Sequence, residues 1–457
     1  MISSDVLAYL RTHETRIRNE LFDFLRIESV STRPEKRADV ARAAEWLAAA
    51  LRAAGLETTV QATPGHPIVV GERRRAPGAP TVLVYGHYDV QPAEPLDEWT
   101  SPPFSPEIRD GRIYARGACD DKGQLFLHVK VLEALRSTRG ELPVNVIVVA
   151  EGEEEVGSEN LAPFVEKHAE RLRADAVVIS DSEMFAPGVP AIVSSLRGIA
   201  YFEIEARGPA RDLHSGSYGG AVANPANALA RVLASLQDGH GRVAIEGFND
   251  RVRRWPDEAL SAIARLPFDE TAFRVETGSP PLDGASTLER LWTLPSCDVH
   301  GLLAGFTGEG SKTVIPARAR AKVSFRLVAD QDPAEIDRLV KAHVAQVAPP
   351  GVAVDVTLLH ASPAWRADLD SDVFAAAARA VEFAFGRPPV AIGAGYSIPI
   401  VGEIERILRA PVLLLGFALP GDNAHAPDEW LSVDCFERGL VAIARLYEEI
   451  ASAAVVD

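Results

Sequence analysis

The chain has few cysteines, no long apolar run and no excess of basic residues, and each shortage excludes a class of protein. Its 3 cysteines are widely spaced and odd in number, so they cannot build a disulfide framework or a cysteine zinc knuckle. No segment approaches the roughly 18 apolar residues of a membrane-spanning helix. Residues 1–30 carry acidic and basic side chains throughout, unlike the apolar core of a signal peptide. We therefore expect a cytoplasmic protein that does not bind a membrane.

Basic residues are the minority, with 47 Lys and Arg against 64 Asp and Glu, which gives a formal net charge of -17. Such a surface repels a phosphate backbone, so nucleic acid is not an expected partner. The 457 residues are 47% hydrophobic and 24% charged, which is the composition of a globular protein and excludes a disordered or fibrous one. At about 150 residues per domain, this length predicts more than one domain.

The first part of the chain has the pattern of an α/β domain. Short, β-branched apolar runs at 81–85, 144–150 and 176–180 are separated by segments with helical periodicity, such as 123–135. Continuous apolar runs of this kind are typical of buried parallel strands covered by helices on both faces. A helix with one apolar face is also expected at 40–54.

The pattern changes near residue 191 and returns after residue 368. Residues 200–206 alternate apolar and acidic side chains, as a half-exposed antiparallel strand does, and 319–328 alternate in the same way. Helices are expected at 226–236 and 333–347, and the stretch around 247–287 has no clear periodicity. We therefore predict a two-part α/β domain, 1–191 and 369–457, interrupted by an inserted α+β domain at 192–368.

Histidines and acidic residues cluster where the apolar runs end, and a further acidic pair, Asp120 and Asp121, lies just before a predicted helix. Ligands of parallel sheets collect beyond the carboxyl ends of the strands. Carboxylates that converge there repel one another, and burying them costs several kcal/mol unless they are paired or bind a cation. Histidines among acids form the ligand set of a divalent metal: zinc is the expected ion, and manganese and cobalt are alternatives. A carboxylate shared by a pair of ions would make a two-metal hydrolytic centre. The clustered residues are His87, Asp120, Asp121, Glu153, Glu154, Glu155, Asp181 and His425.

Six ordered motifs span nearly the whole chain: His87-Tyr88-Asp89-Val90-Gln91-Pro92, Gly117-Ala118-Cys119-Asp120-Asp121-Lys122-Gly123, Glu154-Glu155-Val156-Gly157-Ser158, the region of Asp181, Asp212-Leu213-His214-Ser215-Gly216 and Asn423-Ala424-His425. These motifs resemble those of the M20 family of metallopeptidases, in particular its cytosolic dipeptidase and carnosinase-like branch. The resemblance implies that the ligands form two sets of three, joined by Asp120. One ion would be bound by His87, Asp120 and Asp181, and the other by Asp120, Glu155 and His425.

The resemblance also implies roles for residues beside the ligands. Glu154 would be the general base that takes a proton from a metal-bridging water. Asp89 would orient the His87 imidazole. His214 would reach the scissile carbonyl across a dimer interface, which implies a homodimer. The resemblance likewise implies that 1–191 and 369–457 form the catalytic domain and that 192–368 is a lid or dimerisation domain.

The resemblance also implies that a second set of residues binds the substrate. Arg326 would pair with the free carboxylate of the substrate, since a guanidinium is a two-pronged donor. Thr313 and Ser397 would assist it. The expected reaction is hydrolysis of dipeptides or short peptides.

Alternatives to this reaction stay open on the sequence alone. The loop Gly395–Pro399 reads Gly-Tyr-Ser-Ile-Pro where the family has Gly-Gly-Ser-Ile-Pro. Because the ring of Tyr396 changes the loop expected to face the substrate, an N-acyl-amino-acid amidohydrolase stays an alternative function. A more remote alternative is a catalytically silent binding protein on the same fold. The presence of Glu154 and of every ligand argues against it.

Overall fold

The computed structural model describes residues 4–74, 78–280 and 284–453. The chain divides into two compact units. Unit 1 consists of Met1–Ser194, Ala367–Ile392 and Glu403–Asp457, and unit 2 of Ser195–Arg366 and Gly393–Gly402. The sequence analysis places Gly393–Gly402 with the catalytic domain, whereas this segment groups with unit 2 because Arg197 of unit 2 hydrogen-bonds to it.

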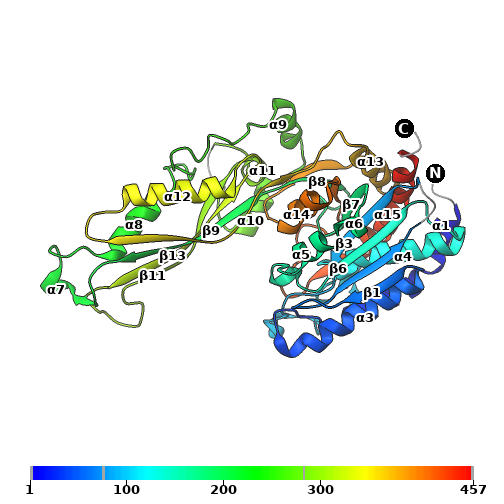
Figure 1. The fold of residues 1–457 in the computed structure, drawn as a ribbon, viewed down its shortest axis with the longest axis horizontal. Helices are drawn as coiled ribbons and strands as arrows, with labels where there is room; N and C mark the ends of the chain where they lie inside the picture. Colours follow the sequence, from blue (N-terminus) through cyan, green and yellow to red (C-terminus); the bar gives the residue numbers. More distant parts are fainter. Residues whose placement is uncertain (1–3, 75–77, 281–283, 454–457) are drawn as a thin grey trace. The chain divides into compact units, whose positions relative to one another are not determined.

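Unit 1 contains a sheet whose four central strands are parallel, in the order β6 (Asn145–Glu151), β3 (Thr81–His87), β7 (Ala176–Ile179) and β17 (Val412–Leu414) (Figure 1). All residues of β3 and β6 are buried, as expected for apolar runs covered on both faces. The predicted α/β class with a mainly parallel sheet is confirmed. Antiparallel strands extend it on both sides: β2 (Ile68–Arg73), β1 (Glu57–Gln61) and β8 (Ala191–Leu196).

Long helices cover this sheet. Helix α4 (Lys122–Arg139) packs on β3 and against α15 (Val433–Ala453), which also packs on α13 (Asp372–Phe385). Helix α3 (Arg37–Ala53) packs on β1 and β2, and it buries the face predicted from its apolar spacing. The other elements of this part of the chain are α1 (Ser4–Thr12), α2 (Glu14–Leu25), β4 (Glu107–Arg109), β5 (Arg112–Tyr114), α5 (Leu161–Lys167), α6 (Ala169–Leu172), β16 (Val390–Ala394), α14 (Pro399–Leu408), β18 (Trp430–Ser432) and the 3-10 turns at Pro34–Lys36, Leu96–Glu98 and Glu154–Val156.

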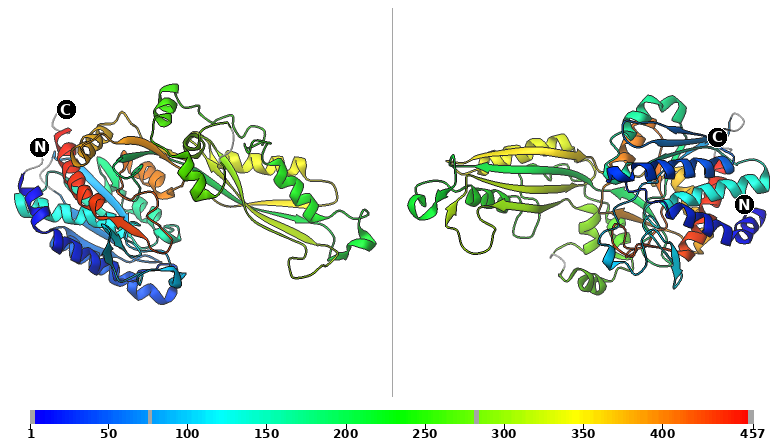
Figure 2. Two further views of the ribbon diagram at one scale, coloured as in Figure 1. Left: turned by 180° about the vertical axis from the view of Figure 1, so that it is seen from behind. Right: turned by 90° about the horizontal axis from the view of Figure 1, so that it is seen from below.

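Unit 2 contains a four-stranded antiparallel sheet in the order β11 (Ser296–Ala304), β13 (Arg318–Leu327), β9 (Gly198–Arg207) and β14 (Ala353–Ser362). Helices α8 (Pro225–Ser235) and α12 (Pro333–Val347) pack on its strands (Figure 2). Buried and half-buried residues alternate along β9, which puts Phe202 and its apolar neighbours under the helices.

Capping residues fix where the two helices of unit 2 begin. Asn224 and Asp332 each accept a hydrogen bond from a first-turn N–H, and a proline occupies the first position of both helices. The stretch without periodicity holds two short helices, α9 (Asp257–Ala264) and α10 (Glu270–Thr277). Their residues are mostly exposed, and each helix has only 8 residues, too few for a helical repeat to be recognised in the sequence. Unit 2 also contains β10 (Leu213–His214), α7 (Ser215–Tyr218), α11 (Thr287–Thr293), β12 (Val314–Ile315) and β15 (Trp365–Arg366).

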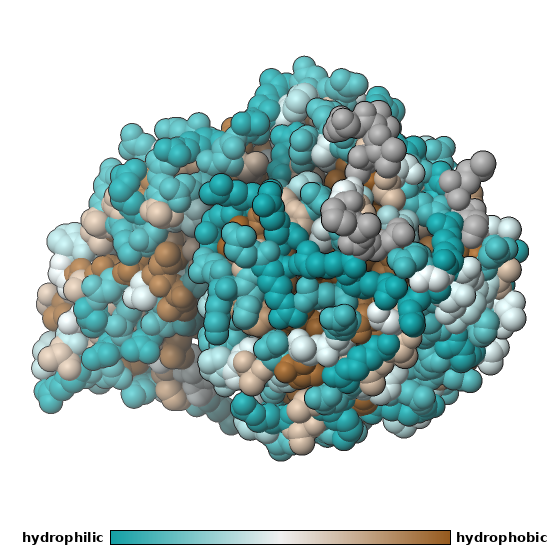
Figure 3. All heavy atoms as spheres, turned by 45° about the vertical axis from the view of Figure 1, so that its right-hand side comes forward, coloured by the Kyte–Doolittle hydropathy of each residue, from teal (hydrophilic) through white to brown (hydrophobic). Residues whose placement is uncertain are grey.

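The surface of the protein is mainly hydrophilic in the view of Figure 3, with hydrophobic residues in scattered patches. Within residues 4–74, 78–280 and 284–453, none of the helices has both the length and the apolar character needed to cross a bilayer.

A buried histidine of unit 1 should make stability depend on pH. His128 of α4 contacts the Ser180 hydroxyl at 2.8 Å and the Tyr447 hydroxyl at 2.9 Å. Burial lowers the pKa of His128 from 6.5 to about 3. The folded pKa lies below the unfolded one, so the contribution of the neutral ring to the free energy of unfolding is complete above pH 6.5. It is lost as the pH falls toward 3, by about 2 kcal/mol at pH 5.

Urea unfolding of metal-free protein at pH 7 and pH 5 measures this loss. The parent should lose about 2 kcal/mol more between these pH values than His128→Gln, which cannot titrate there. An equal pH dependence in the two proteins would contradict the assignment.

Candidate metal centre

The sheet of unit 1 gathers histidine and carboxylate side chains at one edge. His87 is the last residue of β3, Glu154 and Glu155 follow β6, and Asp181 follows β7. These three strands are parallel, so their carboxyl ends share this edge. Asp120 joins them from the loop before α4, and His425 from the loop after β17.

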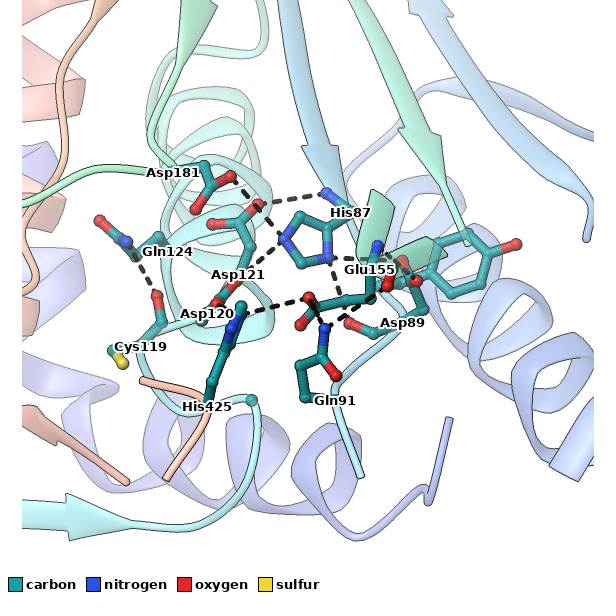
Figure 4. Close-up of polar contacts among 12 residues, drawn as sticks. His87, Asp89, Gln91, Cys119, Asp120, Asp121, Gln124, Glu155, Asp181 and His425 are labelled. Atoms are coloured by element: carbon teal, nitrogen blue, oxygen red, sulfur yellow. Dashed lines mark hydrogen bonds and ion pairs between the residues drawn. The ribbon is translucent and has the colours of Figure 1, made fainter. Parts of the chain in front are cut away.

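Two groups of three side chains offer ligand atoms within 4.8 Å of one another: His87, Asp120 and Asp181, and Asp120, Glu155 and His425. Asp120 belongs to both groups through different oxygens (Figure 4). Its Oδ1 lies 3.1 Å from Nε2 of His87, and its Oδ2 lies 2.8 Å from Nε2 of His425. The structure therefore brings together every residue expected to bind metal, in the two expected sets.

The pKa values of the acidic side chains in this cluster show that their negative charges are unfavourable there. Burial and the nearby Asp120 raise the pKa of Asp181 to about 7. Burial also raises the pKa of Glu154, and the neighbouring carboxylates of Asp181 and Glu155 add to the shift. Hydrogen bonds to Asp120 and Glu155 raise the pKa of His425 to about 10. Carboxylates crowded in this way fit a site for divalent cations, because a cation would offset the repulsion.

Asp89 and Gln91 contact two of the candidate ligands. The backbone carbonyl of Asp89 lies 3.1 Å from Nδ1 of His87, and its carboxylate Oδ1 lies 3.4 Å from the same nitrogen. Its other oxygen accepts the backbone N–H of Glu155 at 3.1 Å. Gln91 donates to Oε2 of Glu155 at 2.8 Å. The sequence analysis assigned no role to Gln91, although it lies inside a motif quoted there.

Comparison with known proteins identifies the family. Residues 83–449 match the sequence profile of peptidase family M20/M25/M40. The chain belongs to this family. The expected membership of M20, and with it the assignment to hydrolases of peptide bonds, is confirmed.

Relatives of this M20 peptidase include several metallodipeptidases. The Cys-Gly metallodipeptidase dug1 of Schizosaccharomyces pombe is 33% identical over 86% of this chain and 84% of its own. The human Beta-Ala-His dipeptidase is 30% identical over 98% of this chain and 92% of its own. The solved structure of the dipeptidase Dug1p from Saccharomyces cerevisiae has a TM-score of 0.84 at 30% identity, over 99% of both chains.

In unit 2 of the M20 peptidase, Arg326 and Ser397 meet. Arg326 of β13 donates from Nη1 to the Ser397 hydroxyl at 3.0 Å, and that hydroxyl donates to the backbone carbonyl of Arg197 at 2.5 Å. The Arg197 side chain donates in turn to the Gly395 carbonyl at 2.9 Å. Arg197 thus supports the loop that carries Ser397 and Tyr396, a role that the sequence analysis did not foresee.

His214 and Thr313 form a second cluster of unit 2. His214 pairs with Val314 in the small β10–β12 sheet, and the N–H of Ser215 donates to the Thr313 carbonyl at 3.0 Å. The His214 side chain is exposed, and its Nδ1 accepts from the N–H of Gly216 at 3.0 Å. This cluster lies beyond the Arg318 end of β13, next to α7 (Figure 1). Arg326 lies near the other end of that strand, about 25 Å along it at about 3.3 Å per residue.

Proposed function

We propose that this chain is a two-metal dipeptidase, which hydrolyses the amide bond of dipeptides or short peptides that have a free C-terminal carboxylate. The observation that carries the proposal is the pair of ligand groups joined by the two oxygens of Asp120, with the acid Glu154 beside them, whose charge interacts with those of His87 and Asp181. The Arg326–Ser397 pair supports recognition of a carboxylate.

The ligands would bind a pair of divalent ions. His87, Asp120 and Asp181 would hold one ion, and Asp120, Glu155 and His425 the other. Imidazole and carboxylate donors suit zinc, and manganese and cobalt are the alternatives. When bound, such ions raise the acidity of water and polarise an amide carbonyl.

The side chains around the ligands would perform the proton transfers. Glu154 would take a proton from the attacking water and pass it to the leaving amine, a role for which its raised pKa suits it. Asp89 would keep the His87 ring in its orientation. His214 would donate to the oxyanion that develops on the scissile carbonyl.

Replacing Arg326 by alanine should raise KM for dipeptides by about 10- to 100-fold, because a hydrogen bond to a charged group contributes about 1.5–3 kcal/mol. Steady-state kinetics on dipeptides and their C-terminal amides measure the effect. The matched control is Arg320→Ala on the same strand, where the arginine is exposed and pairs with Glu205. An equal rise in KM for the amidated substrates would remove Arg326 as the carboxylate partner.

The active form is proposed to be a homodimer in which the partner chain contributes His214. Within one chain His214 and Thr313 lie at the opposite end of β13 from Arg326, too far apart for one dipeptide to contact both. The edge strand β11 supports association, since it exposes Val299, Leu302 and Leu303.

Mixing two inactive variants tests whether His214 acts across the interface. A dimer of one Glu154→Ala chain and one His214→Ala chain should have one intact site, so a one-to-one mixture should recover about a quarter of the parental activity. The assay is turnover of the unfractionated mixture, and of the mixed dimer isolated through two different affinity tags after co-expression, which should have about half of the parental activity. If His214 acts within its own chain, the mixed dimer stays inactive.

The proposal places the enzyme in the cytoplasm, because its cysteines, Cys119, Cys297 and Cys435, are all buried free thiols. Its reaction is tested with chelator-stripped protein, to which zinc, manganese or cobalt is restored, on dipeptides and N-acyl amino acids. Metal-dependent cleavage of dipeptides is the expected result. Cleavage of acyl substrates alone would favour the amidohydrolase, and metal binding without cleavage of either would favour the silent binding protein.

A further inference from the structure

A buried ion pair joins the loops that carry the proposed metal ligands. Glu429 is 0% exposed and Arg116 is 1% exposed, and Nη1 of Arg116 donates to Oε2 of Glu429 at 2.7 Å. Neither residue belongs to the ligand groups. A buried pair of charges contributes little net stability, because the loss of hydration offsets the attraction.

The Glu429 carboxylate organises the loop that ends in Asp120. Oε2 accepts the backbone N–H of Gly117 at 2.9 Å, and Oε1 accepts those of Cys119 at 2.9 Å and Asp120 at 3.2 Å. Three backbone N–H groups within the four residues 117–120 therefore donate to one carboxylate. The last of these donors belongs to the residue that bridges the two ligand groups.

Arg116 extends the connection to two other loops. Its Nη2 donates to the carbonyl of Pro92 at 3.2 Å and to that of Ala426 at 3.3 Å. Pro92 ends the motif that begins with His87, and Ala426 directly follows His425. The ion pair thus contacts all three segments that contribute His87, Asp120 and His425.

We propose that the Arg116–Glu429 pair positions the metal ligands: it holds Asp120 and His425 at the spacing needed to bind ions. The inference rests on the proposed two-metal function. Only a carboxylate at position 429 can accept from every donor that converges there, since a glutamine would turn an NH2 group toward an N–H or toward Arg116. Loss of such an outer contact typically weakens metal binding by about 10–100-fold.

The test is the affinity of purified, folded Glu429→Gln for zinc and for manganese, measured by competition with a chromophoric chelator. We expect affinity to fall by about 10–100-fold, and kcat to recover toward the parental value at saturating metal. The matched control is Glu133→Gln, which removes another carboxylate of unit 1 that accepts from Tyr9, Arg16 and Lys130. It should bind metal as the parent does.

A second variant keeps the proposal testable if Glu429→Gln does not fold. Arg116→Lys retains the charge but cannot reach Glu429, Pro92 and Ala426 together, and it should also weaken metal binding. Parental affinity in a folded Glu429→Gln or Arg116→Lys protein would overturn the positioning role. A parent protein that binds the ions but cleaves no dipeptide would overturn the proposed function instead, because the affinity measurement does not depend on turnover.

Discussion

Replacement of Glu154 by glutamine is expected to lower kcat by about a thousandfold while both metal sites still fill. General-base catalysis contributes about 10²–10⁴ in rate, and an amide cannot accept a proton from water. Glu154 is in neither ligand group, so its loss should leave the donor set intact. Burial and the carboxylates of Asp181 and Glu155 raise the pKa of Glu154, which makes this carboxylate a stronger proton acceptor.

The measurement is kcat on metal-loaded protein together with metal content after gel filtration. Glu153→Gln is the matched control, because the Glu153 carboxylate is turned to His66 and Asn160, with which it makes hydrogen bonds of 3.0 and 2.7 Å. The kcat of Glu153→Gln should stay within a few fold of the parental value. Parental kcat in fully loaded Glu154→Gln would rule out this residue as the base.

The sequence predicts the core of unit 1 well, because its strands must be apolar along their whole length. The runs at 81–85 and 144–150 become β3 and β6, which are buried throughout. Helices α9 and α10 could not be predicted because each has only 8 residues, fewer than the window of about 11–18 residues over which a helical repeat is recognised. The grouping of Gly393–Gly402 with unit 2 could not be predicted either. It depends on contacts with Arg197, which lies nearly 200 residues earlier in the sequence.

The candidate ligands and Asp89 could be found from the sequence, whereas Arg116 and Glu429 could not. His87, Glu155 and Asp181 each lie just after an apolar run, so strand prediction and chemistry point to the same positions. Glu429 follows no such run and resembles any surface acid in the sequence. Only the fold shows that it is completely buried and accepts hydrogen bonds from a loop more than 300 residues earlier.

Replacement of Asp120 by asparagine should remove both ions at once, since Asp120 is the one residue common to both ligand groups. An asparagine has the same shape but a single carbonyl oxygen, so it cannot offer an oxygen to the His87 side and the His425 side together. We expect the affinity for each ion to fall by more than about 100-fold, which exceeds the loss of affinity expected when a residue that only contacts a ligand is replaced. Turnover should become undetectable. Metal content after gel filtration in trace metal measures the loss.

The matched control for this variant is Asp181→Asn, which alters a ligand of only one group. Its protein should lose the ion bound with His87 and keep the one bound with His425, so the two variants should differ in the number of ions that remain. This difference follows from the shared position of Asp120 and not from the loss of a negative charge, since each variant loses one carboxylate. If Asp120→Asn also retained one ion, the two sites would have separate ligand sets, and a bridged pair would be the wrong description of this centre.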